Sequence, residues 1–302
     1  MTLSGLVEDL QDRWRPVQAR LFPRQVLLEL RDDLLRGQVL RHQQPQPVSL
    51  EVPLPPLTCR DGMPLEKEPL GDLIGDLLVR DNLLDAYVLT ALPPAAAEWR
   101  VLDWPLEEPP DEPLQALRLV DPDLGLRQSL ADSCLDLHPL PGTTASMLLV
   151  AASRRLVEAW IEVFHLAGSR LERLAPAQTC QWLALEEHLQ RAPTTQLLAL
   201  LDPLPESSQA GGCRLVLLQA GVPLFERNLP AEPEALVAEL RRCEAFLRRQ
   251  QPHLGPLAVL STAPLPAVDA VETALGCAVM PVDPGPYGSL VLQGLARPEV
   301  LP

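Results

Sequence analysis

The chain has 302 residues with a formal net charge of −15 and contains 34 prolines. It is long enough to bury one large or two modest cores, while its negative charge makes nucleic acid and anionic lipid surfaces poor partners. No apolar run approaches the ~20 residues that span a bilayer, and acidic residues at positions 8 and 9 interrupt any signal peptide, so we expect a cytoplasmic protein without a transmembrane segment.

Residues 2–21 carry apolar side chains at intervals of three and four, which predicts an amphipathic helix. Its charges are mixed rather than basic, so packing on the body of the protein is favoured over a membrane surface. The next elements follow from apolar periodicity and turn residues. They are strands at 26–30, 34–42 and 48–52, a helix at 69–84 and a strand at 85–92.

The stretch YVLTALPPAAAEWRVLDWP, residues 87–105, organises the chain. Its first six residues form an apolar strand, which Pro93 and Pro94 end because proline cannot donate a ladder hydrogen bond. A half-buried strand follows at 98–104. This order predicts that the chain leaves a central sheet to form an inserted subdomain over residues 93–143.

After the insert, the pattern predicts a strand at 147–152 and a helix that Ser153 caps and Gly168 ends. A short strand at 171–174 and a helix at 178–190 complete the first half. The second half repeats the opening order of elements, which indicates a duplication. The predicted divisions are an N-terminal helix at 1–24, a first half at 25–192 and a second half at 193–302.

An apolar strand ending in A-L-P, followed by small residues, an arginine and a strand ending in proline, resembles the PilM family. PilM proteins are actin-like cytoplasmic components of type IV pilus assembly. The resemblance covers about 25–284 and is most marked in SMLLVAASRRLVEAWIEVFHLAGSRLERLAPAQTCQWLAL. It implies an α/β, duplicated actin-like (ribonuclease H-like) fold with an inserted small subdomain.

Actin-like ATPases hold phosphates in two hairpin loops of the form D-x-G-[S/T], where glycine lets the backbone approach the ligand. The first hairpin here reads LELRDDLLR, with Glu29 in place of the aspartate and Arg31 in place of the glycine. Asp32 and Asp33 replace the small hydroxyl residues. Each carboxylate facing a polyphosphate at ~4 Å opposes binding by several kcal/mol at a partly buried site.

The second hairpin keeps Asp202, but Pro203 and Leu204 follow it and no glycine turn forms. Thr262 lies where the adenine-side glycine pair belongs. We therefore expect a degenerate nucleotide site, no cofactor, and a pseudo-ATPase rather than an enzyme. No nucleophile elbow or Walker loop is present, and the six cysteines lie at least 30 positions apart, which predicts no metal site.

The resemblance also implies that a groove between the first subdomain and its insert captures the N-terminal cytoplasmic segment of PilN, an inner-membrane protein. The chain would then be a scaffold held at the inner membrane by PilN-type and other pilus assembly partners. For Trp99 and Trp104, packing beneath the insert is an equally open alternative. The expected contact residues are Tyr87, Leu89, Leu92, Trp99, Val101 and Trp104.

Two other functions stay open. One is an actin-like ATPase or phosphotransferase with an atypical nucleotide site, which only the fold motivates. The other is an actin-like component of a related secretion or division system. The sequence does not decide the oligomeric state.

Overall fold

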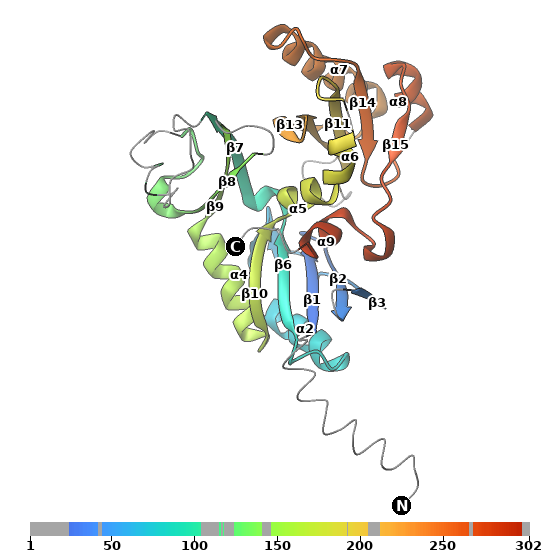
Figure 1. Ribbon diagram of the computed structural model, residues 1–302. Coiled ribbons are helices and arrows are strands. Elements are labelled where there is room, and N and C mark those ends of the chain that lie inside the picture. The colour runs from blue at the N-terminus through green and yellow to red at the C-terminus, as the bar shows by residue number, and fades with distance from the viewer. Residues whose placement is uncertain are drawn as a thin grey trace, which may run out of the picture.

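The computed structural model describes residues 24–41, 44–103, 115, 117, 124–140, 146–191, 193–204, 212–265 and 268–297. It contains two five-stranded sheets, one in each half of the chain (Figure 1). The predicted N-terminal helix over residues 2–21 lies outside these residues. Within the described part of the chain, no helix is both long and apolar enough to cross a membrane.

The first sheet has the strand order β10-β6-β1-β2-β3. β2 pairs antiparallel with both β1 and β3, whereas β6 runs parallel to β1 and β10 runs parallel to β6. Central strands that are apolar along their whole length are typical of a sheet covered on both faces. The bounds are β1 (Gln25–Leu30), β2 (Leu34–Arg41), β3 (Gln44–Pro53), β6 (Tyr87–Leu92) and β10 (Arg170–Pro176).

The second sheet repeats this topology with the order β13-β12-β11-β14-β15. Three antiparallel strands are again followed by two that run parallel to the first. The prediction of a duplicated actin-like fold is therefore confirmed. The strands are β11 (Leu197–Pro203), β12 (Cys213–Gln219), β13 (Val222–Leu229), β14 (Leu257–Ser261) and β15 (Val279–Pro281).

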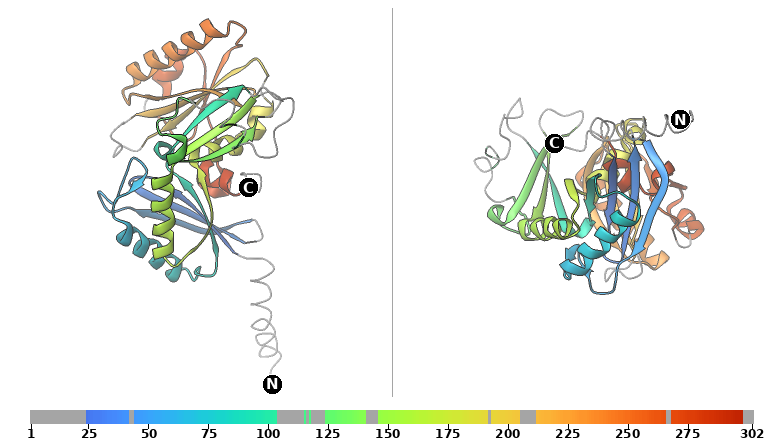
Figure 2. Two further views of the ribbon diagram at one scale, coloured as in Figure 1. Left: turned by 90° about the vertical axis from the view of Figure 1, so that its left-hand side faces the viewer. Right: turned by 90° about the horizontal axis from the view of Figure 1, so that it is seen from below.

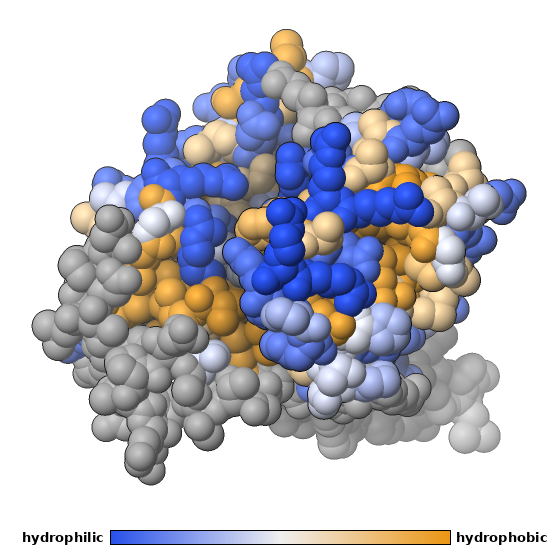
Figure 3. All heavy atoms as spheres, turned by 90° about the horizontal axis from the view of Figure 1, so that it is seen from above, coloured by the Kyte–Doolittle hydropathy of each residue, from blue (hydrophilic) through white to orange (hydrophobic). Residues whose placement is uncertain are grey.

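Helices cover both faces of each sheet. In the first half, α2 (Lys67–Arg80) and α4 (Arg154–Leu166) pack together and share one core cluster with β1, β2 and β6. In the second half, α7 (Pro233–Gln250) and α8 (Val268–Leu275) cover one face. Figure 3, which looks onto this half, shows hydrophilic side chains projecting above apolar residues.

The helix α4 begins and ends where the sequence predicts, but not by the predicted means at both ends. Ser153 occupies the N-cap position without a side-chain hydrogen bond to the helix. Gly168 follows the C-cap residue with φ +64°, a conformation that glycine adopts without strain. Only the C-terminal part of the capping prediction is therefore confirmed.

Between the sheets lie α5 (Ala177–Ala184), α6 (Glu186–Arg191) and α9 (Leu290–Leu295). The helix α9 packs against α5 and against the first sheet, next to β1 and β6. The predicted division at residue 193 assigns α9 to the second half, and Leu290 of α9 does join the core cluster of the second sheet, so this helix packs on both halves. The helix follows the 3₁₀ turn η3 (Gly285–Tyr287).

The insert forms a three-stranded antiparallel sheet in the order β7-β9-β8, which lies to one side of the first sheet (Figure 2, right). The central strand β9 (Ser146–Ser153) lies beyond residue 143, where the insert was expected to end. The apolar strand predicted at 147–152 therefore belongs to the insert's sheet. The other elements of this region are η1 (Pro94–Ala96), β7 (Ala97–Asp103), η2 (Leu130–Asp132) and β8 (Ser133–Pro139).

Candidate functional site

A cleft of about 780 Å³ lies where the first half, the insert and the second half meet. Its floor comes from the ends of β1 and β11 and from α5, and its walls come from η1, β7 and β13. Both wall strands are edge strands, because β7 pairs only with β9 and β13 pairs only with β12 among the described strands. Concave sites between subdomains are where proteins most often bind ligands.

Asp32 occupies the turn that an actin-like ATPase uses to hold phosphate, but here its carboxylate is already bound by the protein. It accepts hydrogen bonds from the backbone N–H groups of Asp61 and Gly62, both at 2.9 Å, and from the Cys59 thiol at 3.4 Å. These donors belong to the hairpin of β4 (Cys59–Arg60) and β5 (Met63–Pro64). The Asp32 carboxylate is therefore bound to the turn of the β4–β5 hairpin.

The turn requires glycine at position 62. Gly62 has φ +79°, and an added Cβ would lie 2.8 Å from the Cβ of Ala96. Asp61 also has positive φ, a conformation that aspartate tolerates better than most residues. The sequence therefore builds this hairpin to bring two N–H donors onto Asp32 and to pack closely on η1.

Glu29 lies at the end of β1 and is only 2% exposed. Its Oε1 accepts a hydrogen bond from Nε of Arg31 at 2.7 Å and forms an ion pair with Nη2 of the same guanidinium, also at 2.7 Å. Its Oε2 is buried without a hydrogen-bond partner among the described residues. Burial disfavours the charged form of Arg31, but the carboxylates of Glu29, Asp202 and Asp33 outweigh it and raise the pKa.

Asp202, at the end of β11, is the corresponding carboxylate of the second half. Its Oδ2 accepts hydrogen bonds from Arg214 at 2.7 Å and from Gln181 at 3.1 Å, and its Oδ1 accepts one from Thr262 at 2.6 Å. Burial by itself would raise the pKa of Asp202. The guanidiniums of Arg214 and Arg31, with the hydrogen bonds from Thr262 and Gln181, hold the pKa below its ordinary value instead.

Arg214 is a buried arginine that sequence reasoning missed, with an exposed fraction of 2%. It donates to Gln181 as well as to Asp202, and its Nη1 lies 3.6 Å from Glu226 on β13. The antiparallel register of β11 and β12 sets Arg214 directly opposite Asp202. An arginine inside the apolar strand CRLVLLQ was the available signal, because a buried arginine needs a carboxylate partner.

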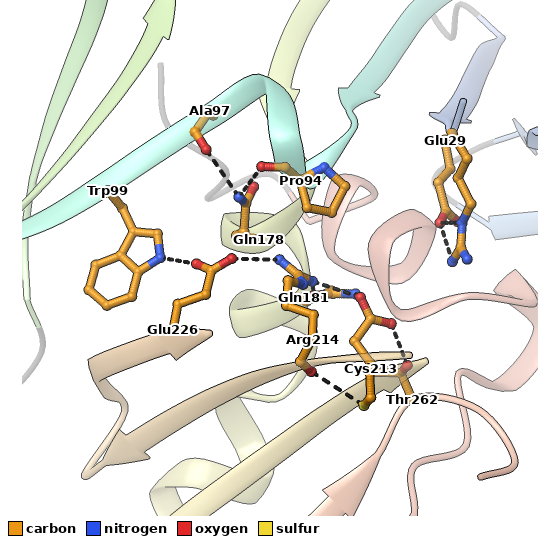
Figure 4. A network of polar contacts seen from close by, with 12 residues as sticks. Glu29, Pro94, Ala97, Trp99, Gln178, Gln181, Cys213, Arg214, Glu226 and Thr262 are labelled. Carbon is orange, nitrogen blue, oxygen red and sulfur yellow. Dashed lines mark hydrogen bonds and ion pairs between the residues drawn. The ribbon is translucent and has the colours of Figure 1, made fainter. Parts of the chain in front are cut away.

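Trp99 connects the insert to the second half. Its indole N–H donates to Glu226 (Figure 4). Its ring meets Trp182 of α5 edge to face, with 5.4 Å between the ring centroids. Of the two roles left open, packing beneath the insert therefore applies to Trp99, although Trp99 and Val101 also line the cleft. Trp104 lies outside the described residues.

Three of the expected contact residues do not form a peptide groove. The strand β6 is paired on both sides, with β1 and β10, and so offers no free edge. Leu89 and Leu92 are 4% and 2% exposed and belong to the core. Tyr87 is half-buried at the opposite end of β6 from the cleft residues. The prediction that Tyr87, Leu89 and Leu92 line the groove is wrong because β6 is an interior strand.

The expected nucleotide-site residues converge, although they come from both halves of the chain. Glu29, Arg31, Asp32 and Asp202 all line the cleft, and Thr262 bonds to Asp202. Asp33 is the exception: its charge helps to raise the pKa of Arg31, but its side chain does not line the cleft. Among the residues that the structure describes, no group of three or more His, Cys, Asp or Glu side chains is arranged to hold a metal ion.

The arrangement fits a triphosphate poorly. Six carboxylates line the cleft, those of Glu29, Asp32, Asp61, Glu98, Asp202 and Glu226. The arginines beside them, Arg31 and Arg214, are already paired with these carboxylates. A phosphate entering here would meet negative charge first and would have to replace internal ion pairs.

No protein-family model matches the sequence, and no curated protein matches it either. Among solved structures, the chain is similar to a PilM–PilN type IV pilus biogenesis complex, with 22% identity over 92% of this chain and 98% of the other and a TM-score of 0.70. The cytoplasmic domain of EpsL, an inner-membrane component of the Vibrio cholerae type II secretion system, matches at 15% identity over 90% and 92%, with a TM-score of 0.52.

A Bacteroides thetaiotaomicron protein with an actin-like ATPase fold also matches, at 9% identity over 93% of this chain and 97% of the other, with a TM-score of 0.53. At these identities the likeness establishes the fold. The predicted resemblance to PilM is confirmed at that level: the chain has the actin-like fold of the PilM structure over nearly its whole length.

Proposed function

We propose that the chain is a non-catalytic cytoplasmic scaffold of type IV pilus assembly that binds the N-terminal cytoplasmic segment of a PilN-type inner-membrane protein. The observation that carries this proposal is the likeness to the PilM–PilN complex, which extends over 92% of this chain and 98% of the other. The scaffold is held at the inner membrane through this partner. No enzymatic activity is part of the proposal.

The cleft supplies what an extended peptide needs. Residues 97–101 of the edge strand β7 line one wall, and residues of the edge strand β13 line the other. A peptide can add to such an edge through main-chain hydrogen bonds, while side-chain pockets supply specificity. Trp99 and Val101 provide apolar surface beside that edge, so the insert, rather than β6, is the proposed peptide-binding element.

The internal ion pairs support a site that works without ATP. The Asp32 carboxylate accepts hydrogen bonds from the N–H groups of Asp61 and Gly62, and Arg214 donates a hydrogen bond to Asp202. These donors are thus already bound to the protein's own carboxylates at the two turns that resemble phosphate-binding hairpins. We infer a pseudo-ATPase without a nucleotide cofactor.

The first prediction concerns the partner peptide. A synthetic peptide of the N-terminal cytoplasmic segment of the PilN-type protein from the same genome should bind the full chain with a Kd on the order of micromolar, because a short segment loses entropy when it orders. Trp99→Ala should weaken binding at least about tenfold through lost aromatic surface. Isothermal titration calorimetry measures both.

Ile161→Ala is the matched control, because Ile161 is exposed on α4 and does not line the cleft. Trp99→Phe keeps an aromatic ring but lacks the N–H that donates to Glu226. Comparing it with Trp99→Ala separates the effect of aromatic contact with the peptide from the effect of the hydrogen bond to the second half. Folding of each variant is checked by circular dichroism. Identical titration curves for the wild type, Trp99→Ala and Ile161→Ala would remove the cleft from the proposal.

A second candidate function is the equivalent component of a type II secretion system, which the likeness to the EpsL cytoplasmic domain favours. Its lower TM-score, 0.52 against 0.70, ranks it second. Affinity purification of the native complex distinguishes the two. A co-purifying PilN-type protein supports the pilus scaffold, whereas type II secretion components would support the alternative.

A further inference from the structure

One hydrogen bond joins the insert to the second half across the cleft. It runs from the indole N–H of Trp99 to Oε2 of Glu226 (Figure 4). Among the described residues, no other hydrogen bond links positions 94–153 to positions 193–297. Trp99 belongs to the edge strand β7 and Glu226 to the edge strand β13, and these strands form two walls of the cleft. The contact therefore fixes one wall relative to the other.

Glu226 is itself held in place by the second half. Its Oε1 lies within ion-pair distance of Nη1 of Arg214, at 3.6 Å, so its two oxygens serve different partners. The register of β12 and β13 sets Arg214 diagonally across from Glu226, a separation that long side chains bridge. Arg214 is 2% exposed and also donates to Gln181 and Asp202. Glu226 therefore offers Trp99 an acceptor whose position is fixed.

The side chains of β7 divide between two faces. On one face, Trp99 and Val101 pack against a core cluster that contains apolar residues of β11 and β12. On the other face, Glu98 and Arg100 form hydrogen bonds to residues 125–127 of the same insert. Of the polar groups that these four side chains carry, the Trp99 indole is thus the one that bonds to the second half.

Two contacts from different parts of the chain orient the Trp99 ring. Its centroid lies 5.4 Å from that of Trp182 on α5, with an angle of 87° between the ring planes. This aromatic contact restricts the plane of the indole, whereas the hydrogen bond to Glu226 fixes the direction of its N–H. An edge strand held in this way presents its free main-chain groups in one orientation. A preformed site of this kind loses less conformational entropy when a ligand binds.

We propose that Glu226 is a positioning residue for the partner segment, which acts through Trp99 to hold the free edge of β7 in its binding orientation. This inference rests on the proposed function and adds a residue outside the insert on which peptide affinity depends. Without the hydrogen bond, the insert samples other orientations. The apparent Kd then rises as the fraction of binding-competent molecules falls.

The contact can be followed without any peptide. The chain has five tryptophans, so isotope-labelled tryptophan gives a small set of indole N–H signals by NMR, and the signal lost in Trp99→Phe is that of Trp99. This signal should shift in Glu226→Ala, because its N–H loses a charged acceptor. Trp160 donates to the carbonyl of Gly62 in the first half, so its signal is the internal control and should stay in place. An unchanged Trp99 signal in Glu226→Ala would overturn the inference.

Peptide affinity is measured by calorimetric titration of the full chain with the PilN-type peptide described above. Glu226→Ala should raise the Kd about fivefold or more, through the loss of a charge-assisted hydrogen bond. Glu226→Gln keeps an oxygen acceptor at the same distance from the backbone and should stay within about twofold of the wild type. Rescue by glutamine separates the acceptor role from a general effect of charge.

Glu172→Ala is the matched control, since Glu172 is exposed on β10 and does not line the cleft. Its Kd should stay within about twofold of the wild type, as expected for a distant, solvent-screened charge. Circular dichroism checks that each variant is folded. Glu226→Gln keeps the proposal testable where Glu226→Ala impairs folding, because a Kd raised about fivefold in a folded Glu226→Gln would contradict the acceptor role.

A double-mutant cycle tests whether Glu226 acts through the indole N–H. In Trp99→Phe the donor is already absent, so adding Glu226→Ala should change the Kd by less than about twofold, because residues in direct contact are not additive. If Glu226→Ala weakens binding equally in the wild type and in Trp99→Phe, Glu226 contacts the peptide directly, and the positioning role is wrong.

Two further results separate this inference from the proposed function. If the wild type binds the peptide and a folded Glu226→Ala binds it equally well, the positioning role is wrong while the proposed function stands. If the wild type does not bind the peptide, the proposed function fails and the positioning role fails with it, whatever the Trp99 signal shows.

Discussion

At the scale of single residues, the cleft is defined by carboxylates that the protein has paired internally. Asp202 shows this most clearly, because it bonds to Arg214, Gln181 and Thr262 at once. Its partner Arg214 is fully enclosed. Removing one member of a buried ion pair leaves the other charge without compensation, which is more damaging than replacing both.

We therefore predict that Asp202→Asn lowers the free energy of unfolding by about 3–5 kcal/mol at neutral pH. The native pKa of Asp202 is lowered, so its stabilisation is complete above the unfolded-state pKa of about 3.9 and is lost as the pH falls below that value. Urea unfolding from pH 7 to pH 2 should show the wild type and variant converging in acid. Asp72→Asn, an exposed change on α2, is the control, and equal effects of the two would contradict the prediction.

The sequence identified part of this residue pattern. Acidic and bulky residues at 29–33 and proline after Asp202 are visible in the order of residues, and these positions do line one cleft, except Asp33. Arg214 and Glu226 were missed because their role depends on strand register. Only the pairing of β11 with β12 sets Arg214 opposite Asp202, and no local pattern gives a cross-strand partner.

At the scale of elements, α5 and α9 pack against each other beneath the cleft and contact both sheets. Gly294 of α9 lies so close to α5 that an added Cβ would overlap the carbonyl oxygen of Cys180. Because that oxygen is part of the backbone, the helices themselves would have to separate. Leu27 and Leu89 of the first sheet share the same core cluster with α9.

Gly294→Ala should accordingly lower the free energy of unfolding by about 1–3 kcal/mol or more through overpacking. Gly75→Ala is the matched control, since Gly75 is also helical and an added Cβ there would lie 3.2 Å from the nearest atom. That milder contact is partly offset by the helix propensity of alanine, worth about 1 kcal/mol. Chemical denaturation measures both, and a Gly294→Ala protein as stable as the wild type would show that this crossing is loose.

Element order was predictable because apolar periodicity and proline breaks are local signals. Which strands pair with one another was not predictable. This explains why β6 was expected beside a groove and why the insert was expected to end before β9. The sequence treats Tyr87–Leu92 as a strand beside a groove, whereas tertiary pairing places it between β1 and β10. The strand predicted at 147–152 is the centre of the insert's sheet because it pairs with β8, just before it in the sequence, and with β7, more than 40 residues earlier.

At the scale of the whole molecule, two similar halves and an insert enclose a cleft whose floor consists of internal ion pairs. Trp99 links the insert to β13 through Glu226, which contacts Arg214 and, through it, Asp202. This chain of contacts crosses the cleft between the two halves. The central claim is that the cleft serves a protein partner and does not require ATP.

Thermal unfolding of the full chain with and without millimolar Mg·ATP tests this claim most directly. A ligand at 100 times its Kd stabilises the native state by about 2.7 kcal/mol, which would raise the Tm of a chain of this size by several degrees. We expect the Tm to change by less than about 1 °C, since the carboxylates that line the cleft oppose the phosphates. A rise of several degrees that requires both magnesium and ATP would contradict it.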